Sequence, residues 1–352
     1  MRHAAAVRVG ARSIGPRHPV FVICEAGVTN YGDRELAMRQ VDAAVEAGAD
    51  AVKFQCWRTE ELVSKPVAAR LAGELGYDWF DRLKTKELTC DDLRALQAYA
   101  TARGILFFVT PHDLLSLEFV DRELQVPLLK VGSGEAHNRD FLRAVGQTGR
   151  PVLISFGLQT DPEVMDAVTT LREAGAAGVV AFHCVTAYPT PPELASLDRL
   201  AALQRMLDAP CGYSDHTVGW HIPAAAVALG ACAIEKHLTF DKRDLRSLDN
   251  PGALLPDEFI RFVSDVRDLE RALTPPDDAA RAAARERARS WAGQSIVAAR
   301  DLPAGTRIDR TMLALKRPGR GGIGPEGIDT LVGRRTTRPV PADEQITAAD
   351  VE

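Results

Sequence analysis

Eight short apolar runs separated by helical patterns are the strongest constraint on how this chain can fold. The runs span 20–24, 51–55, 105–109, 128–131, 151–155, 178–183, 211–214 and 232–236. The helical patterns fall at 34–47, 90–103, 113–124, 138–148, 162–174, 194–207, 220–229 and 256–273. This alternation indicates βαβ units and a parallel sheet. Eight units predict a closed (β/α)₈ TIM barrel over residues 1–273, rather than a Rossmann sheet, because no GxGxxG follows the first run.

A barrel of this kind places its functional side chains at the carboxyl ends of its strands. The predicted ends carry Glu25, Lys53, Gln55, Thr110, Lys130, Ser133, Glu135, Ser155, His183, Ser214, His216, Glu235 and His237. Nearly every strand therefore delivers a charged or hydrogen-bonding group to one rim of the barrel.

Two lysines stand inside otherwise apolar strands, where an unpaired ammonium group is costly. A single such lysine is typical of a structural ion pair, but Lys53 and Lys130 lie at equivalent ends of different strands. Together they favour a site for an anion, with carboxylate and phosphate as the expected ligands. The hydroxyl groups available to donate further hydrogen bonds are those of Thr110, Ser133, Ser155 and Ser214.

Two histidines each follow a strand in the stretch 211–240, which contains GYSDHT and AIEKH. Side chains alternate along a strand, so Ser214 shares a face with His216, and Glu235 shares a face with His237. If the strands are neighbours, this rim can form a metal site or an acid–base site. The other histidines are predicted elsewhere: His183 in the core or just behind the site, and His112, His137 and His221 at the surface or in loops.

Two segments fall outside the repeating unit. Residues 56–89 are longer than an ordinary connection and contain Trp57, Tyr77, Trp79 and Phe80, which predicts a lid or substrate-contact loop over the barrel mouth. After residue 273 the sequence pattern changes, which predicts a linker at 274–290 and then a small β-rich module at 291–352. About 60 residues make a marginal core, so we expect this module to dock onto a barrel, its own or a partner's.

Composition limits the class of protein. The net charge of −5 argues against a nucleic-acid or anionic-membrane partner. Six cysteines without a CxxC pair indicate buried free thiols in a reducing compartment. No secretory-type apolar segment and no run of about 18 apolar residues is seen, so we expect a cytoplasmic protein.

The order of several motifs resembles the sialic acid synthase family, whose relatives include legionaminic and pseudaminic acid synthases. The motifs are EAGVTNYGD, AGADAVKFQ, VTPHD, LKVGSGE, SFGL, FHCVTAYPTPP, GYSDHT and ALGACAIEKH, and KRPG at 316–319 resembles part of an antifreeze-like SAF domain. The resemblance covers essentially the whole chain.

This resemblance implies a transferase that condenses phosphoenolpyruvate with the open-chain aldehyde of a sugar, such as an N-acetylmannosamine-like aldose. The products would be a 2-keto-3-deoxy sugar acid and phosphate, with cleavage of the C–O bond of phosphoenolpyruvate. It also implies a divalent metal, Mn²⁺ or Mg²⁺, bound by His216 and His237. A domain-swapped homodimer would bring the SAF domain over the partner's barrel.

Residue roles follow from the same resemblance. Phosphoenolpyruvate would contact Lys53, Thr110, Lys130, Ser133, Ser155, Thr186 and Ser214. The sugar would contact Glu25, Gln55, Glu135, Tyr188, Asp249, Trp291 and Arg317. The catalytic groups would be Glu25, Lys53, Lys130 and Glu235, with either Glu25 or Glu235 as proton carrier.

Several sugar-side segments depart from the family pattern. The first-strand motif reads GVTNYG where the family commonly has GxNHxG, Thr186 stands where serine or asparagine is common, and residues 245–250 replace a PGPDH-like loop. These departures put N-acetylmannosamine in question as the acceptor sugar more than they put the type of reaction in question.

Two rival functions stay open at this point. One is a Schiff-base pyruvate aldolase on the same barrel, with Lys130 or Lys53 as nucleophile. The other is a non-catalytic barrel that binds a sugar.

Overall fold

The computed structural model describes residues 4–352 and divides into two compact units. The first unit ends at Leu273 and the second runs from Thr274 to Glu352. The division falls where the last apolar helix gives way to the proline-containing segment 274–277. Among residues 4–352, no helix is both long enough and apolar enough to cross a membrane.

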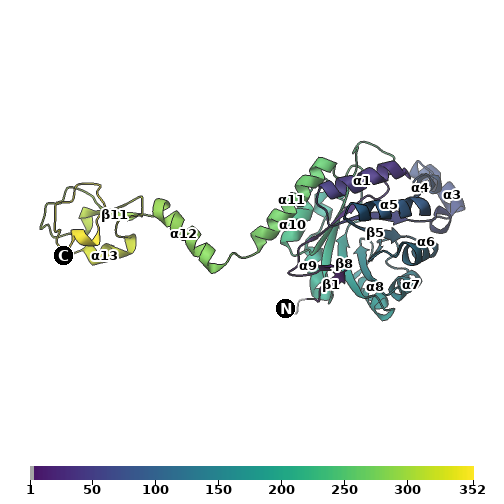
Figure 1. The fold of residues 1–352 in the computed structure, drawn as a ribbon, viewed down its shortest axis with the longest axis horizontal. Coiled ribbons are helices and arrows are strands. Elements are labelled where there is room, and N and C mark those ends of the chain that lie inside the picture. The colour runs from purple at the N-terminus through teal and green to yellow at the C-terminus, as the bar shows by residue number, and fades with distance from the viewer. Residues whose placement is uncertain (1–3) are drawn as a thin grey trace. The chain divides into compact units, whose positions relative to one another are not determined.

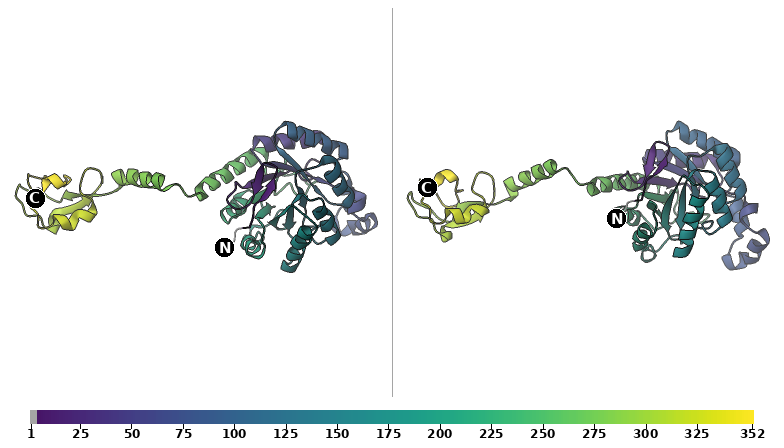
Figure 2. Two further views of the ribbon diagram at one scale, coloured as in Figure 1. Left: turned by 60° about the horizontal axis from the view of Figure 1, so that its bottom comes forward. Right: turned by 90° about the horizontal axis from the view of Figure 1, so that it is seen from below.

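The first unit is a closed parallel barrel, which confirms the predicted fold. Its strands are β3 (Phe21–Glu25), β4 (Ala51–Cys56), β5 (Leu106–Pro111), β6 (Leu129–Val131), β7 (Pro151–Phe156), β8 (Gly178–Cys184), β9 (Cys211–Asp215) and β10 (Ala233–His237). They follow one another around the barrel in chain order, and β10 closes it against β3. Figures 1 and 2 show these strands at the centre of the unit with the helices around them.

Strand register sets the height of each functional side chain. His237 of β10 lies beside Glu25 of β3, and Glu25 lies beside Lys53 of β4. Ser214 of β9 lies beside Glu235 of β10. Parallel strands all end at the same rim, so the register brings these groups to one level of the barrel mouth.

The predicted helices all occur around the barrel. They are α1 (Arg34–Glu46), α5 (Cys90–Ala102), α6 (Leu114–Phe119), α7 (Arg139–Gln147), α8 (Asp161–Glu173), α9 (Asp198–Met206), α10 (His221–Ala228) and α11 (Pro256–Leu273). Local capping explains several starts: Asp33, Asp113 and Asn138 each accept hydrogen bonds from the first turn of a helix. The helix predicted over 113–124 changes at Val120 into a π-helical turn, Val120–Leu124.

The long segment 56–89 is mostly helical rather than a loop. It forms α2 (Thr59–Leu62), α3 (Lys65–Leu75) and α4 (Trp79–Lys84). A proline in the first turn of α3 and the Asp78 side chain at the start of α4 favour these helices. The predicted loop was therefore wrong in conformation, because short capped helices lack the long apolar period that sequence reasoning relies on.

A hairpin, β1 (Val7–Val9) and β2 (Arg12–Ile14), precedes the barrel and adds Val7, Val9 and Ile14 to its core. A short 3₁₀ helix, Pro192–Leu194, follows β8. The six cysteines are free thiols; Cys90 is half-buried and the others are buried.

The second unit begins with an exposed helix, α12 (Asp278–Ala292), none of whose residues is buried. Strands β11 (Ser295–Ala298) and β12 (Leu313–Lys316) pair antiparallel, and α13 (Ile328–Leu331) packs with them. Three 3₁₀ turns, Arg310–Met312, Pro325–Gly327 and Ala348–Asp350, complete the unit. Its small core contains Ile296, Ala298, Leu302, Ile308, Leu313, Leu331, Val340, Ile346 and Val351.

Candidate active site

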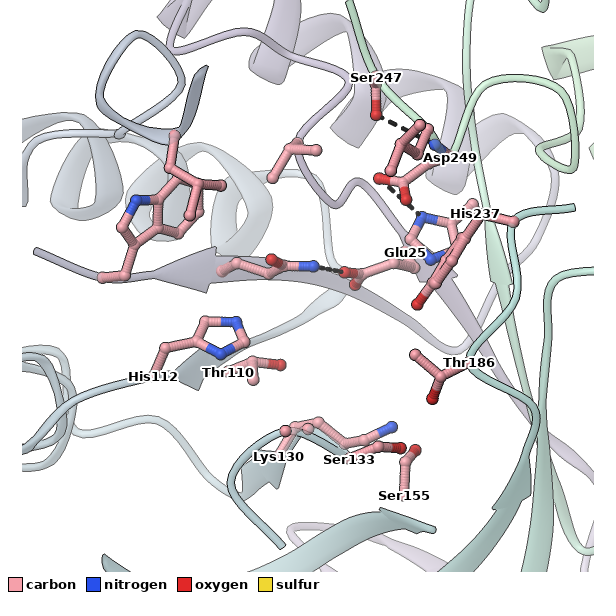
Figure 3. A pocket seen from close by; sticks show the side chains of 18 of the residues that line it. Glu25, Thr110, His112, Lys130, Ser133, Ser155, Thr186, His237, Ser247 and Asp249 are labelled. Carbon is pink, nitrogen blue, oxygen red and sulfur yellow. Dashed lines mark hydrogen bonds and ion pairs between the residues drawn. The ribbon is translucent and has the colours of Figure 1, made fainter. Parts of the chain in front are cut away.

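A cavity of about 450 Å³ opens at the carboxyl ends of the barrel strands. Figure 3 shows its two sides: Lys130, Ser133 and Ser155 are grouped on one, and His237 and Asp249 lie together on the other. Concave sites with a few converging polar groups are the usual form of a small-molecule binding site.

One carboxylate holds the two buried lysines of the first side. Lys130 Nζ lies 2.8 Å from Glu235 Oε2, and Lys53 Nζ lies 3.9 Å from the same oxygen. Lys53 is also 2.8 Å from Glu25 Oε2 and donates to Thr110 Oγ1 at 2.9 Å. Ser214 Oγ donates to Glu235 at 3.1 Å. Both lysines therefore lie close to the same carboxylate, that of Glu235, in the barrel mouth.

The pKa values of this cluster follow from burial and pairing. Burial lowers the pKa of Lys53, but the carboxylates of Glu235 and Glu25 outweigh it and hold the pKa above its ordinary value. Burial lowers the pKa of Lys130, and Glu235 offsets only part of that effect. Burial would raise the pKa of Glu235, but Lys130 and Lys53 lower it to about 2. Glu235 is therefore ionised at neutral pH.

Hydroxyl groups surround the lysines. Ser133 Oγ accepts a hydrogen bond from the Gly157 amide at 2.9 Å. Ser155 Oγ is buried and has no hydrogen-bond partner within residues 4–352. A buried hydroxyl without a partner is uncommon in folded proteins, so it indicates a place for a ligand atom. Thr110, Thr186 and Ser214 line the same cavity.

Carboxylate and amide groups line the region between the two sides. Gln55 Nε2 donates to Glu25 Oε1 at 2.7 Å, as Figure 3 shows for the labelled Glu25. Glu135 lies 3.1 Å from His112 Nδ1. Burial raises the pKa of Glu135, but His112 outweighs burial and lowers it. These acceptors suit a polyhydroxylated ligand.

Two imidazoles face each other on the second side, with ring centroids 5.4 Å apart. His216 Nδ1 donates to the carbonyl of Val185 at 2.8 Å, which leaves Nε2 with a free lone pair. Burial and the neighbouring His237 lower the pKa of His216 to about 4, so this ring is neutral. His237 Nδ1 is buried without a hydrogen bond among the described residues and lies 3.6 Å from Asp249 Oδ2.

These donors fit a divalent metal, because neutral imidazole nitrogens and a nearby carboxylate are metal-binding groups. Gly27 allows the close packing: its φ is +53°, and a Cβ there would lie 3.0 Å from His237 Nδ1. No cluster of three or more His, Cys, Asp or Glu side chains at metal-binding geometry occurs within residues 4–352. A metal held here by the two imidazoles would have coordination positions left for other ligands.

The structure brings every predicted site residue of the barrel into this one cavity. Its lining contains Glu25, Lys53, Gln55, Thr110, Lys130, Ser133, Glu135, Ser155, Thr186, Tyr188, Ser214, His216, Glu235, His237 and Asp249. Trp291 and Arg317 belong to the second unit, where both are exposed, and their roles stay predictions. His183 points into the core, where it is bonded to the carbonyl of Ala195 and packs on Tyr213.

Sequence reasoning missed several residues of the lining. His112 was predicted at the surface or in a loop: it does lie in the loop directly after β5, but it is partly buried, lines the cavity and packs edge-on against Trp57. Its place one residue after β5 was the available signal. Arg82 and Lys86, from α4 and the turn after it, were missed because segment 56–89 was assigned to the barrel mouth by its aromatic residues, and its basic residues were not singled out.

Comparisons with known proteins agree with the two-unit architecture. The model of the NeuB family matches residues 40–277, and the SAF domain matches residues 293–352. The chain is 34% identical over 350 residues to N-acetylneuraminate-9-phosphate synthase of Mus musculus, covering 97% of this chain and 95% of that protein.

Two further relatives cover nearly the whole of their own length. N,N'-diacetyllegionaminic acid synthase of Legionella pneumophila is 34% identical, covering 97% of this chain and 98% of that protein. The crystal structure of N-acetylneuraminic acid synthetase from Leptospira borgpetersenii, in complex with citrate, superposes with a TM-score of 0.72. That structure is 30% identical and covers 81% of this chain and 97% of its own.

We expect Glu235→Gln to destabilise the protein, because two buried ammonium groups lose their shared carboxylate. The free energy of unfolding should fall by about 3 kcal/mol, the cost of an uncompensated buried charge. Inorganic phosphate should restore stability more in the variant than in the wild type, since the anion replaces the missing charge. Urea unfolding with and without phosphate, at constant ionic strength, measures both effects.

The matched control is Glu173→Gln, which removes a carboxylate from the exposed face of α8. It should behave as the wild type does. An equal response of wild type and Glu235→Gln to phosphate would show that the anion does not reach the lysines.

Proposed function

The chain belongs to the NeuB family and ends in a SAF domain, and from this we propose that it condenses phosphoenolpyruvate with the open-chain aldehyde of a sugar. The products are a 2-keto-3-deoxy sugar acid and inorganic phosphate. The observation that carries the proposal is the pair of buried lysines joined through Glu235 in the same cavity as two facing imidazoles.

The lysine side of the cavity suits phosphoenolpyruvate, which carries a phosphate and a carboxylate. Lys130 and Lys53 supply two ammonium groups, and Ser155 Oγ supplies an unused donor. Ser133, Thr110, Thr186 and Ser214 complete the hydrogen-bonding groups on this side. Charge-assisted hydrogen bonds of this type are short and strong, so they fix the enol in one orientation.

The reaction forms one C–C bond and breaks one C–O bond. C3 of phosphoenolpyruvate attacks the aldehyde carbon, and the aldehyde oxygen takes up a proton. Water adds at C2 and loses a proton, which forms a new C2–O bond. The C2–O bond to phosphate then breaks as the new C2 hydroxyl gives up its proton and becomes the ketone oxygen. Glu235 lies near both buried lysines, so we assign the proton transfers to Glu25, which accepts from Gln55 and has its ion pair with Lys53.

His216 and His237 would hold the divalent metal, Mn²⁺ or Mg²⁺. A metal bound there supplies a Lewis acid for the aldehyde oxygen. Val185 fixes the His216 ring, and Asp249 and Gly27 fix the position of His237. Tyr188, whose ring centroid lies 4.0 Å from that of His216, shields this side of the cavity.

The sugar would lie between the two sides, where Glu25, Gln55, Glu135 and Asp249 offer acceptors for its hydroxyl groups. Arg317 and Trp291 would reach it from the SAF domain of a partner chain in a domain-swapped homodimer.

A lysine Schiff-base aldolase is the second candidate, favoured by the lowered pKa of Lys130. The 2.8 Å contact between Lys130 Nζ and Glu235 Oε2 argues against this candidate. The contact stabilises the protonated amine, which is not nucleophilic.

A panel of aldoses with phosphoenolpyruvate should separate these functions. We expect release of inorganic phosphate and a product whose mass equals the sugar plus pyruvic acid. Lys130→Met should lower the rate by about 100-fold or more, because it removes a charge at the reacting anion. Lys84→Met, an exposed lysine of α4 outside the cavity, should keep the rate. Trapping of pyruvate on Lys130 by borohydride would instead establish the aldolase.

Removing the metal or its ligands should abolish the reaction but not the fold. EDTA should stop phosphate release and Mn²⁺ or Mg²⁺ should restore it. His237→Ala should bind less Mn²⁺ in equilibrium dialysis and lose activity, while its circular dichroism matches the wild type. His137→Ala, an exposed histidine outside the cavity, is the matched control. Full activity of His237→Ala without metal would refute the metal assignment.

Mixing two inactive variants tests the domain swap. Lys130→Met damages the barrel and Arg317→Ala damages the SAF domain. In a swapped heterodimer one site combines an intact barrel with an intact SAF domain, so co-expression should restore about one quarter of wild-type activity. No recovery in isolated heterodimers would exclude the swap.

A further inference from the structure

A second cavity, of about 560 Å³, adjoins the active site. Its lining is Tyr31, Arg82, Thr85, Lys86, Asp244, Leu245 and Arg246. Arg82 and Lys86 also line the active-site cavity, so these two side chains stand where the cavities meet. The walls come from α4 with its following turn and from the loop 241–250, one of the segments in which this chain departs from the family pattern.

Lys86 differs from the other buried lysines of the described chain. Lys53, Lys130 and Lys236 each lie against a carboxylate: Glu25, Glu235 and Asp215 respectively. Lys86 is only 6% exposed, yet within residues 4–352 its ammonium group has neither a hydrogen bond nor an ion pair. The ammonium group is not fully enclosed by protein atoms, and Lys86 lines both cavities. An unpaired cation in a cavity wall indicates an anionic ligand, because it can form charge-assisted hydrogen bonds there.

Arg82 adds a second cation at the same place. Its guanidinium lies 4.3 Å from the centre of the Tyr77 ring and donates to the carbonyls of Leu245 and Arg246 at 3.0 and 3.3 Å. These contacts tie α4 to the loop 241–250. Within the described residues Arg82 has no carboxylate partner, and its remaining N–H groups are available to an anion.

Arg246, by contrast, is already neutralised. It pairs with Asp244 at 2.6 Å and stacks 3.9 Å from the centre of the Tyr31 ring. Burial and the charge of Arg82 lower the pKa of Lys86 to about 8, and the charges of Asp249 and Asp244 oppose this. The junction therefore carries two uncompensated positive charges at neutral pH.

The backbone holds Lys86 in place. Gly32 has φ +74°, and a Cβ there would lie 3.0 Å from the carbonyl oxygen of Glu87 and 3.2 Å from that of Thr85. Only glycine allows the 26–33 loop to approach the turn so closely. The contact fixes the backbone of the turn that carries Lys86.

We propose that Lys86 and Arg82 bind a phosphate monoester at the end of the acceptor sugar distant from its aldehyde. This rests on the proposed function, which assigns the deeper lysines, Lys53 and Lys130, to phosphoenolpyruvate. A phosphate monoester carries close to two negative charges and several acceptor oxygens, which match one ammonium and one guanidinium group. The substrate class is then an aldose phosphate rather than a neutral aldose.

The kinetic test uses aldohexoses and N-acetylaldohexoses in matched pairs, free and 6-phosphorylated, with product formation followed by mass. We expect the wild type to prefer the phosphorylated member by about 100-fold in kcat/KM, because two charged contacts are gained. Lys86→Met should reduce this preference to within about threefold, by loss of the same contacts. Lys84→Met keeps the preference, since Lys84 is exposed and lines neither cavity.

A binding test separates failure of this proposal from failure of the proposed function. Hexitol 6-phosphate has no aldehyde, so its affinity for the phosphoenolpyruvate-saturated enzyme, measured by calorimetry, does not depend on the reaction. Binding that is lost in Lys86→Met and in Arg82→Met supports the phosphate site even if no sugar of the panel reacts. Urea unfolding should show that Lys86→Met is folded.

Four results would overturn the proposal. They are equal turnover of free and phosphorylated sugars by the wild type, a preference that survives in Lys86→Met, absence of hexitol 6-phosphate binding, and binding that depends on Lys130 instead of Lys86. Equal affinity for hexonate, which carries a carboxylate, would overturn the assignment to phosphate.

Discussion

The shared contact of Glu235 with Lys130 and Lys53 is the interaction on which the rest of the site depends. The three side chains come from β10, β6 and β4, so the contact spans the interior of the barrel. Each group would be costly to bury alone, and together they form a compensated cluster. The cluster keeps two positive charges at the base of the cavity while the chain remains folded without a ligand.

The two sides of the cavity are built in different ways. The lysine side rests on strands, whose positions are set by the closed hydrogen-bonded barrel. The imidazole side depends on loops: the 26–33 loop places Gly27 against His237, and the loop 241–250 supplies Asp249. Loops tolerate sequence change more readily than barrel strands do, so the imidazole side is the one that can vary more easily. The unpaired Lys86 lies on the loop side, where α4 meets 241–250.

Most of the fold could be predicted because its signals are local. Apolar strands, helix periods and caps such as Asp33 and Asn138 depend only on near neighbours, and the barrel then follows from the alternation. The helices of 56–89 escaped prediction because they are short and weakly patterned. The cavity position of His112 was not predicted, because a single histidine in a loop carries no sign of its partner, and Glu135 lies 23 positions later in the chain.

By itself, the sequence determined the barrel, the order of its strands and the residue types at their carboxyl ends. The reason is that the alternation of apolar strands with helices, and the order of residues along each strand, can be read from the chain without knowing its tertiary structure. Only the tertiary structure decided which charges are compensated. Lys53, Lys86 and Lys130 look alike as buried lysines, yet two meet carboxylates from distant strands and the third does not. Whether a lysine has a carboxylate partner depends on the distance between segments that are far apart in the chain. Those segments come together only when the barrel closes.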